Sequence, residues 1–166
     1  MKKNRKWNEN CYLITIEDPE FLLAKIIKDV LNHMLEVIDF KYIVFADVFC
    51  CSPIPNAVHN MIEQEGEIQL LKNFVKNLDN YESFESGDFY LFLENPFNLS
   101  AEMRPGYLMY QAETTITALD DHYIYIYTLY PQIVAQIQKK YSIESLSVGT
   151  IETFLSYTPG AAGDRG

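Results

Sequence analysis

The pattern of hydrophobic and polar residues changes its period along the chain, and each period predicts an element. Residues 11–17 (CYLITIE) mix β-branched and aromatic residues, which predicts a strand. Asp18-Pro19-Glu20 then supplies an N-cap, a first-turn proline and an early carboxylate, and apolar residues recur at helical spacing as far as Ile38. Residues 41–51 (KYIVFADVFCC) are almost continuously apolar, which is typical of a central strand buried on both faces.

The rest of the chain predicts more helix, a hairpin and a last strand. Apolar spacing favours helix over 56–78, interrupted near Gly66. The later segments are a short strand at 89–93, a hairpin from 107–119 and 123–130, a helix at 132–140 and a strand at 145–157. This order indicates an α+β domain over residues 1–157, with a mixed or mainly antiparallel sheet of five to six strands packed with three to four helices.

The two ends of the chain differ in composition from its interior. Residues 1–10 start with a basic cluster and predict a frayed N-terminus, because no apolar stretch of a signal peptide follows. Residues 158–166 contain no large apolar residue and predict a flexible, Gly-rich tail. The most apolar run is about half the ~20 residues that a membrane span needs. Because the cysteines, Cys11, Cys50 and Cys51, form no disulfide framework, we expect a cytoplasmic protein that does not associate with membranes.

The register of the hairpin follows from the requirement that its two faces separate polar from apolar residues. A two-residue loop leaves both faces mixed, whereas a three-residue loop, Asp120-Asp121-His122, places Ile124 opposite Ala118 and Ile126 opposite Ile116. Aspartate tolerates the left-handed backbone that such loops often require. The sequence therefore predicts a second face that carries Tyr123, Tyr125 and Tyr127 beside Thr117, Thr115 and Glu113.

Charge gives this hairpin a candidate role. The chain has 13 Lys+Arg against 23 Asp+Glu, a net charge of -10. Residues 77–138 contain nine acidic residues and one base, Arg104, together with eight of the twelve tyrosines. Tyrosine offers a large contact area with a polar tip, and clustered carboxylates attract a basic partner. The predicted partner-binding residues are Glu85, Asp88, Glu94, Glu113, Asp120, Asp121, Tyr123, Tyr125 and Tyr127.

A purely structural interpretation competes with this one. Tyrosine is a good strand residue, and helices usually cover at least one face of such a sheet, so the tyrosine stripe can be partly core. A charge-rich segment can likewise be a solvated surface that keeps the protein soluble. The acidic balance disfavours a nucleic-acid binder that works by neutralising phosphates.

The sequence contains no recognised motif for catalysis or cofactor binding. It has no Gly-rich phosphate loop, CxxC, HExxH, GxSxG or dinucleotide fingerprint, so we expect no cofactor and no metal site, and an enzyme is the less favoured class. The nearest approach to a reactive cluster is Asp47 with Cys50 and Cys51 near the end of an apolar strand. A cysteine nucleophile there would need a base and a lowered thiol pKa.

Three hypotheses of function follow. The leading one is an acidic, non-enzymatic binding or inhibitor protein, similar in logic to immunity proteins and antitoxins, that occludes a basic partner such as a nucleic-acid-acting toxin. The second is a small cytoplasmic enzyme with a pocket near Asp47, Cys50 and Cys51. The third is a subunit of a homo-oligomer that uses the Tyr-rich hairpin as its interface.

Overall fold

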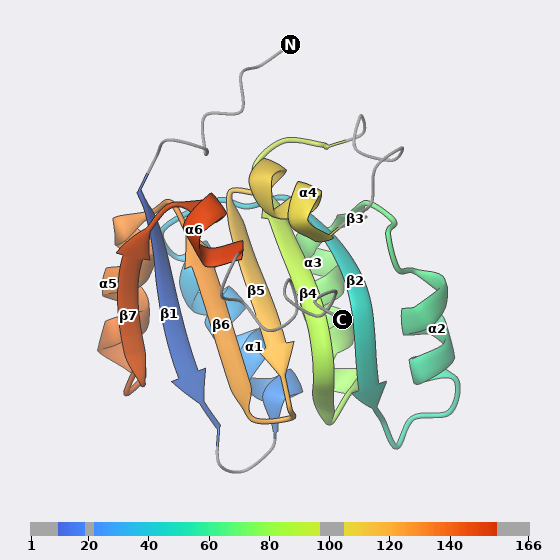
Figure 1. Ribbon diagram of the computed structural model, residues 1–166. Coiled ribbons are helices and arrows are strands. Elements are labelled where there is room, and N and C mark those ends of the chain that lie inside the picture. Colours follow the sequence, from blue (N-terminus) through green and yellow to red (C-terminus); the bar gives the residue numbers. More distant parts are fainter. Residues whose placement is uncertain (1–9, 19–21, 97–104, 156–166) are drawn as a thin grey trace, which may run out of the picture.

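Seven strands form one sheet in the computed structural model, which describes residues 10–18, 22–96 and 105–155 (Figure 1). The strand order is β3-β2-β4-β5-β6-β1-β7, and every neighbouring pair is antiparallel. The strands are β1 (Cys11–Glu17), β2 (Tyr42–Cys51), β3 (Gln69–Leu70), β4 (Ser83–Phe92), β5 (Thr114–Leu119), β6 (Tyr123–Thr128) and β7 (Ser145–Gly149). The strand missing from the prediction is β3, which is too short to show a period.

Six helices and one 3-10 turn join these strands within the described residues. They are α1 (Leu23–Leu35), α2 (Ala57–Glu63), α3 (Leu71–Asn77), the 3-10 turn η2 (Leu78–Asn80), α4 (Pro105–Gln111), α5 (Pro131–Lys140) and α6 (Ile151–Leu155). The α+β class is confirmed, but the number of helices exceeds the predicted three to four. The predicted frayed N-terminus (1–10) and Gly-rich tail (158–166) lie outside the described residues, apart from residue 10.

Three sequence predictions of element type were wrong in detail. Residues 107–111 belong to α4 and residues 151–155 to α6, although both segments were predicted as strand. The predicted helix over 56–78 is divided by β3 into α2 and α3. A helix of five to seven residues has too few turns to show a 3.6-residue period, so its burial against the sheet decides its structure.

The main core lies on the face of the sheet that α1, α3 and α5 cover, which we call the helical face. Figure 1 shows these three helices behind the sheet, with α4 and α6 in front of it. Phe45, Phe74, Phe84 and Phe89 form an aromatic cluster here, with neighbouring ring centroids 5.2–6.3 Å apart. These side chains are buried, and each contributes roughly 25 cal/mol for every Å² of apolar surface removed from water.

The opposite face, which we call the second face, is covered over only one half. There α4 and α6 contribute Leu108, Met109, Ile151 and Phe154, which pack with Tyr90 and other strand residues in a second hydrophobic cluster. Figure 1 shows both short helices at the same end of the sheet. The other half of the second face lies under no helix of the described chain.

The hairpin register is confirmed. Leu119 pairs with Tyr123, Ala118 with Ile124 and Ile116 with Ile126, as the three-residue loop requires. Asp120 and Asp121 adopt left-handed backbone angles, with φ of 54° and 64°, and the His122 amide donates to the Leu119 carbonyl oxygen at 3.3 Å. No helix among the described residues is both long and apolar enough to cross a bilayer.

Candidate functional site

The candidate site is the half of the second face that lies under no helix of the described chain, and we call it the open half-face; Phe49 is exposed there, whereas Thr15 and Thr117 are buried. Two rows of side chains cross the strands there, because paired residues in an antiparallel sheet project to the same side. One row consists of Ala46, Asp88, Thr117, Tyr125, Thr15 and Ser145. The other consists of Phe49, Ser86, Leu119, Tyr123 and Glu17.

A β-bulge in β2 gives this face its exposed phenylalanine. Asp47 and Val48 together stand opposite the single residue Gly87, and Asp47 has a left-handed φ of 55°. The extra residue turns Val48 into the core and leaves Phe49 on the second face with 67% of its surface exposed. A Cβ atom on Gly87 would lie 3.1 Å from Val48 Cγ2, so the bulge leaves little room for a side chain at this position.

The bulge is held by specific hydrogen bonds. The Val48 amide donates to Glu65 Oε1 at 2.7 Å, and Ser86 Oγ donates to the Asp47 carbonyl oxygen at 3.2 Å. A second irregularity follows, where Glu85 of β4 has no partner in β2 between the pairs Phe49–Ser86 and Cys50–Phe84. Bulges often occur beside functional sites, where they change the direction of a side chain, as this one does for Phe49.

Aromatic rings form a continuous strip along the hairpin side of the open half-face. The rings of His122 and Tyr123 have centroids 4.1 Å apart, and Tyr123 stacks on Tyr125 with centroids 6.3 Å apart. Burial, followed by the neighbouring Tyr123 and Asp120, raises the pKa of Tyr125, so its hydroxyl stays protonated and can donate a hydrogen bond. The strip therefore presents flat apolar rings with a donor at the tip.

Asp88 is the most perturbed carboxyl group of this surface. Burial raises its pKa to about 6, a hydrogen bond from Thr117 opposes that shift, and the nearby Asp47 charge adds to it. Thr117 Oγ1 donates to Asp88 Oδ1 at 2.8 Å. The same burial, with Asp88 and Asp47 close by, raises the pKa of Tyr90. A cation close to Asp88 would stabilise its ionised carboxylate and so offset the cost of burying that charge near Asp47.

The strands carry charge of one sign only. Glu17, Asp47, Glu85 and Asp88 are their charged residues, and no Lys or Arg occurs in β1–β7. The described part of the chain contains seven lysines, of which six lie on the three helices of the helical face: Lys25, Lys28, Lys72, Lys76, Lys139 and Lys140. The helices of the second face, α4 and α6, contain one charged residue, Glu152.

The structure brings together six of the nine predicted partner-binding residues. Asp88, Tyr123 and Tyr125 lie on the open half-face, and Asp120 and Asp121 form the hairpin turn at its border. The Asp121 amide approaches the Glu85 carbonyl oxygen at 3.4 Å, which brings Glu85 to the same border.

The other three predicted residues lie elsewhere. Tyr127 is only 2% exposed and packs against Phe154 of α6, with ring centroids 6.1 Å apart. Glu113 accepts a hydrogen bond from the Leu93 amide at 3.0 Å. Glu94 follows β4 at the same, covered end of the sheet, as the pairing of Leu91 with Thr114 shows. The tyrosine stripe is thus part surface and part core.

Sequence reasoning missed Phe49 and Glu17. Phe49 stands in an apolar run that predicts burial, and only the bulge at Asp47 exposes it. Glu17 lies 106 residues before Tyr123, and the pairing of β1 with β6 places the two residues opposite each other. An aspartate inside an otherwise apolar strand was the one local signal that could have indicated the bulge.

The residues of the enzyme hypothesis do not form a reactive cluster. Cys50 packs against the core, and burial, followed by Cys51 and Glu65, raises the pKa of its thiol to about 11. Asp47 is exposed at the bulge, and no hydrogen bond joins it to either cysteine within the described chain. A thiol with so high a pKa is not an activated nucleophile at neutral pH.

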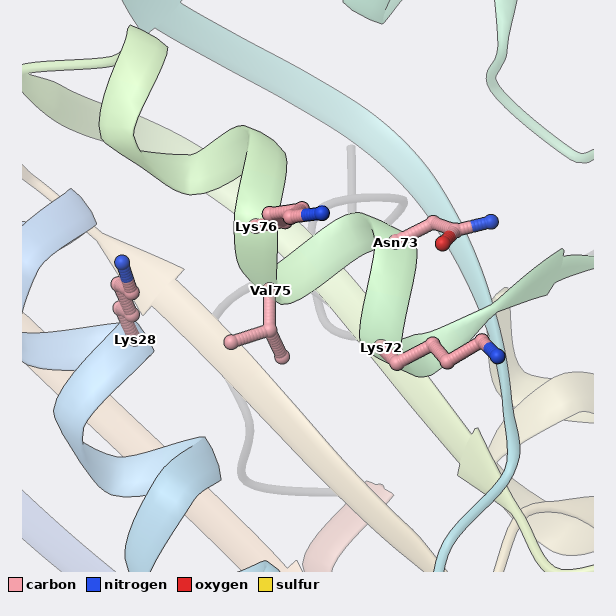
Figure 2. A pocket seen from close by; sticks show the side chains of 5 residues that line it. All are labelled: Lys28, Lys72, Asn73, Val75 and Lys76. Carbon is pink, nitrogen blue, oxygen red and sulfur yellow. The ribbon is translucent and has the colours of Figure 1, made fainter.

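A cavity on the helical face also lacks the geometry of a site. Its volume is about 460 Å³, and Lys28, Lys72, Asn73, Val75 and Lys76 line it. Figure 2 shows Lys28 and Lys72 at opposite sides of the view, with their ammonium groups directed to different points. Lys28 is moreover paired with Asp79 at 2.6 Å. These lysines contribute to a surface of mixed charge and do not converge on an anion.

Comparison with known proteins provides no name for this arrangement, since no family model, curated protein or solved structure significantly matches the chain.

Proposed function

We propose that this chain is an acidic, non-enzymatic binding protein whose open half-face occludes a basic protein partner, as immunity proteins and antitoxins do with nucleic-acid-acting toxins. The observation that carries the proposal is the concentration of aromatic rings and carboxylates on the half of the sheet that no described helix covers. No base occurs in any strand to oppose a positive partner.

The chemistry of the open half-face suits arginine and lysine side chains. The exposed ring of Phe49 and the partly exposed ring of Tyr123 can stack on a guanidinium group or form a cation–π contact. Asp88 lies between these rings in the neighbouring row and can accept a charged hydrogen bond. Large aromatic anchors surrounded by polar groups are the usual composition of the energetic centre of an interface.

The chemistry of the partner follows from the same features. A protein that acts on nucleic acid has a basic groove for phosphates, and an array of carboxylates on a rigid sheet competes for that groove. The acidic turn at Asp120 and Asp121 stands at the border of the face, where it attracts such a groove during encounter. Association is therefore expected to be fast at low salt and to slow as the ionic strength rises.

A capture experiment with matched variants tests the proposal. Wild-type protein is immobilised beside two double variants, Asp120→Asn/Asp121→Asn and Glu63→Gln/Glu67→Gln. Asparagine tolerates the left-handed turn, and the second pair removes the same charge from the region of α2. We expect a basic protein from native lysate to bind the wild type and the Glu63/Glu67 variant at low salt. The amount of this protein captured by the Asp120/Asp121 variant should be at least about tenfold lower.

The captured protein is then tested for cleavage or binding of nucleic acid in the presence of the wild type. Loss of that activity at stoichiometric addition supports occlusion. Equal capture by both double variants, or a captured protein that stays fully active in the complex, contradicts the proposal.

A further inference from the structure

The strand β7 is the last strand of the sheet on its side within the described residues. In the described chain it pairs only with β1, and Figure 1 shows it as the outermost strand on its side, with α5 behind it. Ser145, Leu146, Ser147 and Val148 are all exposed, and the two apolar side chains are 41% and 59% exposed. The free edge therefore offers unpaired backbone groups together with exposed apolar side chains.

Sheet edges normally carry features that prevent further pairing, such as lysine, proline or a bulge. β7 has none of these in its sequence Ser-Leu-Ser-Val-Gly, and its pairing with β1 runs in regular register from Ser145 to Gly149. On the opposite side, β3 pairs only with Tyr42 and Ile43, and the rest of β2 is interrupted by the bulge at Asp47 and bonded through Phe45 and Val48 to Gly66 and Glu65. Of the two edges, β7 is thus the one that can accept another strand.

The flank of α5 next to this edge is also uncharged. Gln136 donates a hydrogen bond to Glu36, the residue that caps the C-terminus of α1, so α1 lies on that side of α5. Pro131, Ala135 and Gln138 follow one another at spacings of four and three residues, on the exposed side of α5 away from Gln136. The edge strand β7 and this flank of α5 (Pro131, Ala135 and Gln138) together form a surface without charged residues, which we call the uncharged strip. It lies on a chain whose net charge is -10.

We propose that this strip is a homodimer interface, in which β7 pairs antiparallel with β7 of a second copy about a two-fold axis at Ser147. In that register Leu146 faces the partner's Val148, and Val148 faces the partner's Leu146, all on the helical face. Ser145 faces the partner's Gly149 on the other side. The two sheets join into one, and the two α5 helices lie side by side and antiparallel.

A second copy fits this strip better than it fits any other surface described above. Two chains of net charge -10 repel each other, and contact through the open half-face would place carboxylates against carboxylates. Contact through residues 145–149 places no charged residue opposite another. The pattern is also self-complementary, as a two-fold interface requires. The dimer leaves Asp88 and the rings of His122, Tyr123 and Tyr125 uncovered. The dimer and the proposed function can therefore each hold without the other.

Sedimentation equilibrium of the full chain tests the surface. We expect the wild type to approach twice its 19.3 kDa with rising micromolar concentration, and Val148→Lys to remain a monomer, because a lysine at an edge strand opposes pairing. The control is Ile62→Lys on α2, whose side chain is 55% exposed, and it should dimerise as the wild type does. A wild type that stays monomeric throughout, a Val148→Lys variant that still dimerises, or equal loss in both variants overturns the proposal.

Cysteine cross-linking tests the register in chains that carry Cys51→Ser. Ser147→Cys places two thiols directly opposite each other at the two-fold axis, at a Cα separation within the range of a disulfide. Ser145→Cys places its two thiols about 13 Å apart along the strands. With oxidised glutathione, Ser147→Cys should give at least about ten times more covalent dimer than Ser145→Cys. Equal yields from the two variants overturn the register and with it the two-fold pairing.

Discussion

Alternate residues of the same seven strands build two faces that differ in cover and in charge. The helical face is closed by α1, α3 and α5, which carry six lysines and one carboxylate, Asp29. Among the described residues, helices α4 and α6 cover one half of the second face, and the strands of the other half carry carboxylates and aromatic rings. A side chain on the first face therefore serves stability, whereas one on the open half-face is available for recognition.

The largest expected effect compares phenylalanines from the two faces. Phe89 is fully buried, with its ring centroid 5.2 Å from that of Phe84, and Phe89→Ala should lower the free energy of unfolding by about 3–5 kcal/mol. Phe49 is 67% exposed, and Phe49→Ala should cost less than about 1 kcal/mol. Urea denaturation measures both. Similar losses in the two variants would mean that the faces do not differ as described.

The next prediction divides the tyrosine stripe. Tyr127 lies under α6, so Tyr127→Ala should cost about 3 kcal/mol of unfolding free energy. Tyr125 lies in the open half, and Tyr125→Ala should cost about 1 kcal/mol. Thermal and urea unfolding measure these losses. Below their unfolding temperatures, Tyr125→Ala should capture less of a basic partner than Tyr127→Ala does. If Tyr127→Ala loses more of both stability and capture, Tyr125 has no recognition role.

The third prediction concerns Asp88 and pH. Its pKa of about 6 in the folded chain lies above the ordinary 3.8, so the folded state holds this proton more tightly than the unfolded state. The stabilisation is present below about pH 4 and is lost as pH rises through 6. Asp88→Asn keeps an acceptor for Thr117 and removes the buried charge, so it should raise the free energy of unfolding at pH 8 by about 1–3 kcal/mol.

Urea unfolding from pH 4 to pH 8 measures this effect as the difference between wild type and variant. The difference should grow between pH 4 and 7 and then level off. The matched control is Glu82→Gln, which removes an exposed carboxylate. A wild-type-like slope in Asp88→Asn would show that other groups govern the pH dependence.

The smallest expected effect concerns the bulge in β2, which places Val48 on the helical face and Phe49 on the second face. Glu65→Ala removes the acceptor of the Val48 amide and should cost about 1 kcal/mol. Glu65→Gln retains an oxygen acceptor and should be close to neutral. Hydrogen exchange of the Val48 amide should accelerate in the alanine variant alone, and equal protection in all three proteins would show that Glu65 does not hold the bulge.

Local patterns predicted most of the long elements, but of the ten-residue strand β4 (Ser83–Phe92) they predicted only the part from 89 onward. The helical spacing up to Ile38 contains α1, the apolar run at 41–51 became β2, and the requirement that polar and apolar residues separate gave the correct hairpin register. Each of these depends on a period that repeats several times within one segment. The segments of α4 and α6 repeat too few times, and they fold as helices because Leu108 and Phe154 find apolar cover on the sheet.

Only the part of the candidate site that depends on a repeated local pattern could be predicted from the sequence. The sequence alone determined an acidic α+β chain with a tyrosine stripe on one face of a hairpin, because alternation along a strand is a local property. Which tyrosines stay accessible depends on where α4 and α6 end, and the exposure of Phe49 depends on the left-handed Asp47. The placement of Glu17 and the free edge of β7 depend on strand order. Only the tertiary structure decided these points, because each results from contacts between segments far apart in the chain.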